Sequence, residues 1–119
     1  MEARAVRKYI RSSPRKMRTV VNLVRGKNVA EALSILHYMP QKATRPVELA
    51  IQSAVYNLMD RNREERIDEN ELIVRDIHVD EGPTFKRHRP APRGRAHPIQ
   101  KRTSHLTVVV GTVAEEEVA

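Results

Sequence analysis

The chain has 119 residues and a formal net charge of +7, from 22 Lys and Arg against 15 Asp and Glu, and it contains no cysteine. The lack of cysteine excludes disulfides and thiolate metal sites, and it agrees with a reducing compartment. The length predicts one domain with a modest core. No apolar run approaches the ~18 residues of a membrane span, and the amino-terminal segment lacks the apolar region of a secretory signal.

Residues 3–11 alternate in character and predict an edge strand, with Val6 and Ile10 on its weakly apolar face. Its cations, Arg4, Arg7 and Lys8, would discourage aggregation between strands. That structural role does not exclude contact with RNA.

Three helices are predicted after this strand. The first has Ser13 as N-cap and Pro14 at its first position, and Gly26 ends it. Its apolar stripe is Met17, Val20, Val21 and Val24. The second follows Asn28, ends at Met39 and Pro40, and has the stripe Val29, Ala32, Leu33 and Leu36. The third holds a 3.6-residue period through Val47, Ala50, Ile51, Ala54, Val55 and Leu58. Residues 60–71 are a polar connector that could instead extend this helix.

A long β-hairpin is predicted next, with strands at 72–79 and 106–110. Between them, residues 82–105 form a basic, Pro-rich arm without Asp or Glu. Its seven cations, equal in number to the whole net charge, are Lys86, Arg87, Arg89, Arg93, Arg95, Lys101 and Arg102. The expected fold class is therefore α+β, with a three-helix layer packed on a small antiparallel sheet and a protruding hairpin. We expect a single RNA-binding domain over 1–114 and a disordered acidic tail over 115–119.

Charge is segregated along the chain. Residues 1–27 hold nine basic residues against one acidic, residues 28–81 hold six against eleven, and residues 82–114 hold seven against none. Two basic blocks flanking an acidic middle favour contact with a polyanion. The alternative is a soluble protein whose surface charge is merely uneven.

The sequence shows no catalytic constellation and predicts neither an enzyme nor a cofactor. There is no Gly-rich phosphate loop, and His88, His97 and His105 lie in or beside the arm without carboxylates or a recognised zinc spacing. We therefore expect no metal. The carboxylates Asp76, Asp80 and Glu81 are expected to form salt bridges with cations at the arm base, in preference to acid–base catalysis.

The basic segments favour folded RNA over other nucleic acids. The arm lacks the aromatic platform of a single-strand binder, and no helix resembles a DNA recognition helix. Arg-rich extended segments that become ordered on binding suit RNA shape and phosphates. The predicted RNA-binding residues are Arg4, Arg7, Lys8, Arg11, Arg15, Lys16, Arg18, Arg25, Lys27, Lys86, Arg87, His88, Arg89, Arg93, Arg95, His97, Lys101, Arg102 and His105. Arg25, close to a helix end, could instead interact with the helix dipole.

Three segments resemble one known family. VDEGPTFKRHRPAPRGRAHPIQKRTSHLTVVV, at 79–110, is similar to the signature hairpin of the large-subunit ribosomal protein twenty-two family, of the bacterial type. Residues 12–33 resemble the first helix pair of that family, and residues 46–57 resemble its central helix. The connector at 60–71 is more charged than the family leads us to expect, and the tail extends past the usual end.

This resemblance implies a cytoplasmic structural protein of the ribosome. It implies a domain on the outer surface of the large subunit that binds ribosomal RNA early in assembly. The hairpin would run inward, and its tip would line the nascent-peptide exit tunnel near a macrolide site; the tip residues would be Arg87, His88, Arg89, Pro90, Ala91, Pro92, Arg93 and Gly94. The implied partners are large-subunit ribosomal RNA, neighbouring large-subunit proteins and the nascent peptide, with no membrane. A free-standing regulator or RNA chaperone using the same arm is the alternative.

Overall fold

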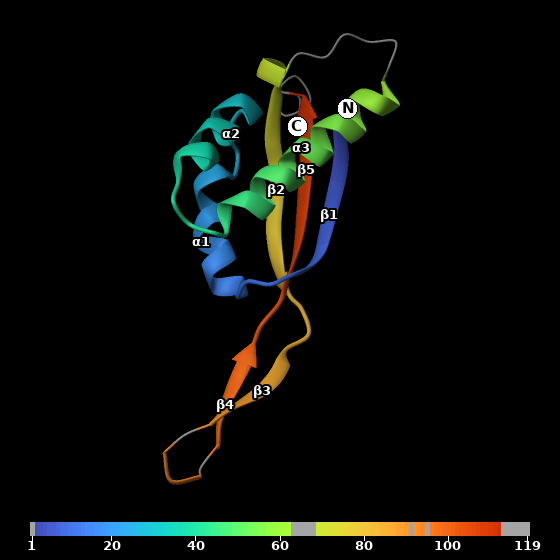
Figure 1. Cartoon of the computed structure of the whole chain (residues 1–119). Helices are drawn as coiled ribbons and strands as arrows, with labels where there is room; N and C mark the ends of the chain where they lie inside the picture. Colours follow the sequence, from blue (N-terminus) through green and yellow to red (C-terminus); the bar gives the residue numbers. More distant parts are fainter. Residues whose placement is uncertain (1, 63–68, 91, 95, 113–119) are drawn as a thin grey trace.

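The molecule has a body, in which three helices cover one face of an antiparallel sheet, and a narrow arm that continues from two strands of that sheet (Figure 1). The structure is a computed structural model and describes residues 2–62, 69–90, 92–94 and 96–112. The body sheet has the order β1-β5-β2, from Glu2–Ile10, Ser104–Thr112 and Leu72–Glu81. The α+β class predicted from the sequence is confirmed.

The first two helices begin and end where the sequence signals predict. Helix α1 (Pro14–Val24) is capped by the Ser13 hydroxyl, which accepts from the Lys16 N–H, and α2 (Val29–Tyr38) by the Asn28 side chain, which accepts from Ala30. Helix α3 (Thr44–Arg61) is the longest. All the predicted stripe positions of the three helices are buried except Leu33, which is partly buried.

The sheet supplies the other half of the core. Along β5, Leu106, Val108 and Val110 are fully buried, while Thr107 and Val109 alternate with them and are half-buried. On β2, Leu72, Val74 and Ile77 are fully buried under the helices. The core is therefore aliphatic, and the period-2 alternation of β5 fixes which face it turns to the helices.

Strand β1 lies at the sheet edge as predicted, but the prediction of its apolar face is wrong. Ala3, Ala5 and Ile10 are its buried residues, whereas Val6 is 45% exposed. A bulge explains the difference. Arg7 pairs with Leu106 and Ile10 with Ser104, so β1 carries one extra residue that turns Ile10 to the face of Ala3 and Ala5.

The opposite edge of the sheet is covered by side chains and backbone from α1 and the segment after it. Arg18 donates to the Val79 carbonyl at 3.1 Å, and Arg25 donates through Nη2 to the Ile77 carbonyl at 2.7 Å. The backbone of Gly26 and Lys27 exchanges two hydrogen bonds with Val74. These contacts satisfy edge carbonyls that would otherwise invite another strand.

The arm is a second, two-stranded sheet formed by β3 (Phe85–Pro90) and β4 (Ala96–Lys101). Its turn contains Pro92–Gly94, where Arg93 and Gly94 both have positive φ, of 66° and 72°. The radius of gyration is 17.6 Å, against roughly 13.5 Å for a compact domain of this length. The predicted arm is thus confirmed. The predicted acidic tail and residues 63–68 of the predicted connector lie outside the described residues, within which α3 ends at Arg61.

Candidate nucleic-acid interface

The arm leaves the body through a hydrogen-bonded neck, formed by Ser12, Gly82, Pro83, Thr103 and Ser104. The Thr103 hydroxyl donates to the Pro83 carbonyl and the Ser104 hydroxyl to the Ser12 carbonyl, both at 2.6 Å, and the Gly82 N–H donates to Thr103 O. Thr103 and Ser104 are almost completely buried. The neck therefore fixes the arm base to the body by polar contacts.

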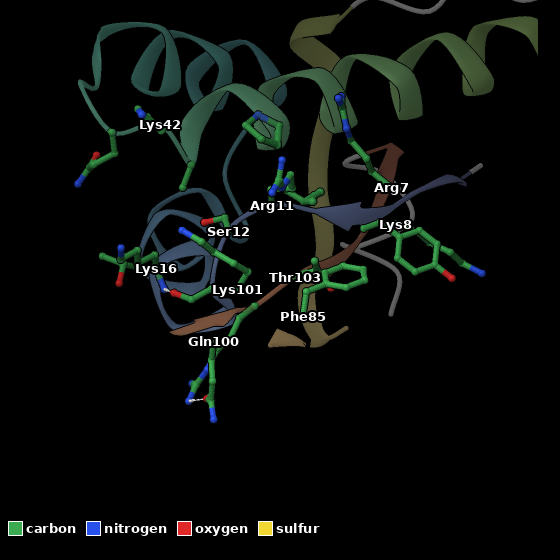
Figure 2. A pocket seen from close by; sticks show the side chains of 18 residues that line it. Arg7, Lys8, Arg11, Ser12, Lys16, Lys42, Phe85, Gln100, Lys101 and Thr103 are labelled. Carbon is green, nitrogen blue, oxygen red and sulfur yellow. Dashed lines mark hydrogen bonds between the residues drawn. The ribbon is translucent and has the colours of Figure 1, made fainter. Parts of the chain in front are cut away.

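A basic cleft of about 1070 Å³ opens beside this neck, between the body and the arm base (Figure 2). Among the residues that the structure describes, seven cations and no Asp or Glu line it. These are Arg7, Lys8, Arg11, Lys16, Lys42, Lys101 and Arg102. The seven are far apart in the sequence, on β1, the segment after it, α1, the loop before α3, and the end of β4. Gathering like charges costs folding free energy unless an anion neutralises them, so the cleft is built for a polyanion.

Two aromatic rings border the same cleft. Phe85 is 54% exposed and pairs in register with Lys101, so both side chains stand on one face of the ribbon. Tyr9 is 62% exposed and has a positive φ of 59°, which is unusual for a bulky residue. The Tyr9 N–H donates to His105 Nδ1 at 3.1 Å, and the two rings meet edge to face with centroids 5.0 Å apart.

The sequence matches the family described as ribosomal protein L22p/L17e over residues 5–111. The chain belongs to this family. The large ribosomal subunit protein uL22 of Salinibacter ruber is 62% identical over 117 residues, which cover 98% of this chain and 94% of that protein. Proteins of the same name from Desulfitobacterium hafniense Y51 and Chlorobaculum tepidum are 55% and 50% identical, covering 92% and 95% of this chain and 93% and 95% of their own lengths.

Membership of the L22p/L17e family agrees with the predicted lack of enzymatic activity, because its members are structural ribosomal proteins. Within the described residues, no group of three His, Cys, Asp or Glu is arranged to hold a metal. In the same residues, no helix is long and apolar enough to cross a membrane. Asp76 and Asp80 lie beside His78, at 3.5 and 3.6 Å. Among the ion pairs found within the described residues, neither carboxylate is joined to a cation of the arm base, where we expected salt bridges.

Most of the predicted RNA-binding residues fall into three groups in this L22p/L17e chain. Arg7, Lys8, Arg11, Lys16, Lys101 and Arg102 come together in the basic cleft. Lys86, Arg87, His88 and Arg93 are exposed along the arm and at its tip. Arg18 and Arg25 bind β2 carbonyls, and His105 contacts Tyr9, so these three have structural contacts. Arg25 is held by the sheet and by Asn22, not by the helix dipole alone.

The remaining predicted positions are more scattered. Arg4 and Arg15 are exposed on β1 and α1, and Lys27 is half-buried at the junction with β2. Arg89 and His97 pair in register on the arm. Two predicted positions, Ala91 and Arg95, lie outside the described residues.

Sequence reasoning did not select Lys42, Tyr9 or Phe85 as site residues. Lys42 belongs to the acidic middle of the chain and follows a helix that Pro40 ends, so its position gave no signal. The fold brings it to the cleft because the loop between α2 and α3 and the carboxyl end of β1 line the same space. The two rings are separated by 75 residues, and only the antiparallel return of β5 along β1 unites them at one site.

Proposed function

We propose that this protein is a structural constituent of the large ribosomal subunit, that it binds large-subunit ribosomal RNA, and that it supports subunit assembly. The observation that carries this proposal is the basic cleft at the junction of body and arm, where the described lining residues include seven cations and no carboxylate. Its relatives are named as proteins of the large ribosomal subunit, which supports the same proposal.

The cleft supports binding to a nucleic-acid backbone more than to a small anion. Its seven cations are more than a small anion would neutralise, and they come from the body and the arm together. An RNA backbone in the cleft would therefore hold the arm against the body. Arg11 and Arg102 can each present a planar fork to phosphate oxygens, whereas Lys16, Lys42 and Lys101 act as point charges.

The arm extends this interface away from the body. Lys86, Arg87 and His88 are all exposed, and the molecule measures 66 × 25 × 23 Å. A two-stranded ribbon with exposed side chains is marginal in water, so a partner must order it. We propose that the arm passes through ribosomal RNA and that its tip, residues 87–94, lines the nascent-peptide exit tunnel. The nascent peptide and neighbouring large-subunit proteins would then be its other partners.

Salt dependence of RNA binding tests the cleft. Replacing both Lys101 and Arg102 with Ala should weaken binding to large-subunit RNA. By analogy with duplex nucleic acid, the log–log salt slope should become shallower by about 0.9 for each phosphate that the variant no longer neutralises. Arg61→Ala, which removes an exposed cation from the far end of α3, is the control and should leave the slope unchanged. An unchanged slope in the double variant would show that the cleft faces solvent.

Co-sedimentation separates a ribosomal constituent from a free regulator with the same cleft. We expect the protein to remain with the large subunit after a high-salt wash, because an integral component is held by many contacts at once. Release into the supernatant at the same salt concentration would contradict the structural role and favour a loosely associated factor.

A further inference from the structure

We propose that the basic cleft holds an unpaired nucleotide of RNA, with its base stacked on the Phe85 ring and its neighbouring phosphates on Arg11, Lys16 and Lys101. This inference rests on the proposed function and makes it more specific. It distinguishes a site for a single-stranded or bulged nucleotide from a surface that reads only the backbone of a helix.

The aromatic residues of this chain are placed for contact and not for the core. There are only four, one Phe and three Tyr, in 119 residues. All four are more than half exposed, from Phe85 at 54% to Tyr38 at 84%, so none of them belongs to the core. Two of the four, Tyr9 and Phe85, line the basic cleft. A site for phosphates alone needs no exposed ring, whereas a site for a splayed nucleotide needs both cations and a ring.

The position of Phe85 couples the ring to the charges. It is the first residue of β3 and pairs with Lys101. The neck, where Thr103 binds the Pro83 carbonyl, lies two residues away along each strand. In Figure 2 the Phe85 side chain borders the open space of the cleft, with Arg11 across that space and Lys101 and Lys16 along another side. A base lying on this ring would have its own phosphates within the reach of cations from both the body and the arm.

The backbone at Tyr9 supports a built site. A positive φ for a bulky residue stores strain, of the order of 1–3 kcal/mol, and persists only where surrounding contacts impose it. Here the His105 ring holds the Tyr9 N–H and packs against the Tyr9 ring. The same bulge turns Ile10 into the core, so Tyr9 remains on the cleft rim as a second aromatic surface.

The dimensions favour an unpaired strand over a duplex. The cleft volume of about 1070 Å³ matches a small-molecule site and admits a few nucleotides. Its lining is apolar as well as charged, because it includes Ala43, Pro46 and Phe85. Apolar surface adds nothing for a hydrated phosphate, but it suits the face and edge of a base.

Phe85 is the only phenylalanine of the chain, so selective labelling with ring-¹³C phenylalanine gives a single set of ring signals. The probes are an oligoadenosine octamer and a blunt RNA hairpin with a matched number of phosphates. A base stacked on the ring shields its protons, so we expect the Phe85 signals to move upfield with the octamer and to move much less with the hairpin.

Phe85→Leu tests the same contact by affinity, since it keeps an apolar side chain and removes the ring. We expect octamer binding to weaken on the order of tenfold, with an unchanged salt slope and an unchanged melting temperature. Tyr56→Leu is the matched control. It removes a ring that is 66% exposed on α3 and does not line the cleft, and it should leave octamer affinity unchanged.

Three results would overturn the inference. The first is an unmoved Phe85 signal at saturating octamer, and the second is full affinity in Phe85→Leu; if Lys101 and Arg102 still determine the salt slope in either case, the proposed function stands. The third is a larger Phe85 shift with polyglutamate than with RNA, which would assign the cleft to an acidic protein segment. Loss of all salt-dependent RNA binding, together with release from the large subunit, would instead overturn the proposed function itself.

Discussion

Two stretches of chain run through both the body sheet and the arm, but the two regions are stabilised by different interactions. In the body, β2 and β5 pair beneath the helices, and Leu72, Ile77 and Leu106 have no exposed surface. In the arm, the continuing strands β3 and β4 pair with each other alone, and Phe85, Lys86 and Arg87 are all exposed. Backbone pairing is common to both regions, so the difference lies in what covers the ribbon.

This difference separates two tasks within one hairpin. A strand pair covered by helices is stable through apolar burial, at roughly 25 cal/mol for each Å² removed from water. An uncovered pair depends on a partner, and the charge of the arm indicates that the partner is a polyanion. The neck, where Thr103 and Ser104 are buried, is the boundary between the strand pair that the helices cover and the uncovered strand pair of the arm.

The largest expected effect concerns the covered region. Val20→Asp would place an unpaired carboxylate on the fully buried stripe of α1 and should reduce the free energy of unfolding by about 4 kcal/mol. Thr19→Asp, its exposed neighbour on the same helix, is the control and should change stability by less than about 0.5 kcal/mol. Chemical denaturation of both variants measures the difference. Equal stability would show that α1 does not pack on the sheet through this stripe.

A substitution at the neck should have an intermediate effect. A Cβ at Gly82 would lie 2.5 Å from the Thr103 hydroxyl and 3.3 Å from the His105 ring, so Gly82→Ala should cost about 2 kcal/mol. Gly94→Ala is the control. Its φ of 72° also disfavours Ala, but its Cβ would meet no described atom within 4 Å and it lies at the uncovered tip. Thermal unfolding should show a lower melting temperature for Gly82→Ala and an unchanged one for Gly94→Ala; the reverse order would mean that the tip, not the neck, is coupled to the body.

A smaller effect is expected where α1 covers the edge of β2. Arg25→Met keeps the length of the side chain but removes the donors to the Ile77 carbonyl, so the body should lose about 1 kcal/mol of stability. Arg15→Met removes an exposed cation from the same helix and should be nearly neutral. If the two variants unfold at the same denaturant concentration, the hydrogen bonds from Arg25 to the Ile77 carbonyl do not stabilise the body.

Much of the fold could be predicted because its signals are local. Ser13 with Pro14, the 3.6-residue stripe from Val47 to Leu58 and the alternation of Leu106 with Val108 each specify an element within a few residues. The face of β1 could not be predicted in this way. Its bulge is set by pairing with a strand about 100 residues away, and one extra residue reverses which side chains are buried.

The charged part of the site was also visible in the sequence, because residues 82–105 contain seven cations without a carboxylate. The assembly of the basic cleft was not. Lys42 lines the cleft only because of where the fold places the α2–α3 loop. Arg18 and Arg25 instead donate hydrogen bonds to carbonyls at the sheet edge, and no sequence pattern predicts those contacts. A net charge predicts a partner class, whereas the tertiary fold decides which cations can reach it.

The smallest expected effect on stability comes from the largest change in the arm. Deleting residues 86–95 and joining Phe85 to Ala96 removes five cations but no residue of the core cluster. The free energy of unfolding should therefore change by less than about 0.5 kcal/mol, and in the intact free protein the arm amides should exchange rapidly with solvent. The shortened protein keeps the neck and the cleft, so we expect it to enter the large subunit, with weaker RNA affinity. Its defect should appear at the proposed tunnel-lining tip, as altered nascent-chain stalling or altered macrolide inhibition in ribosomes that carry it. Normal occupancy with normal stalling and drug response would contradict the role of the tip, whereas loss of the folded body in isolation would contradict the independence of body and arm.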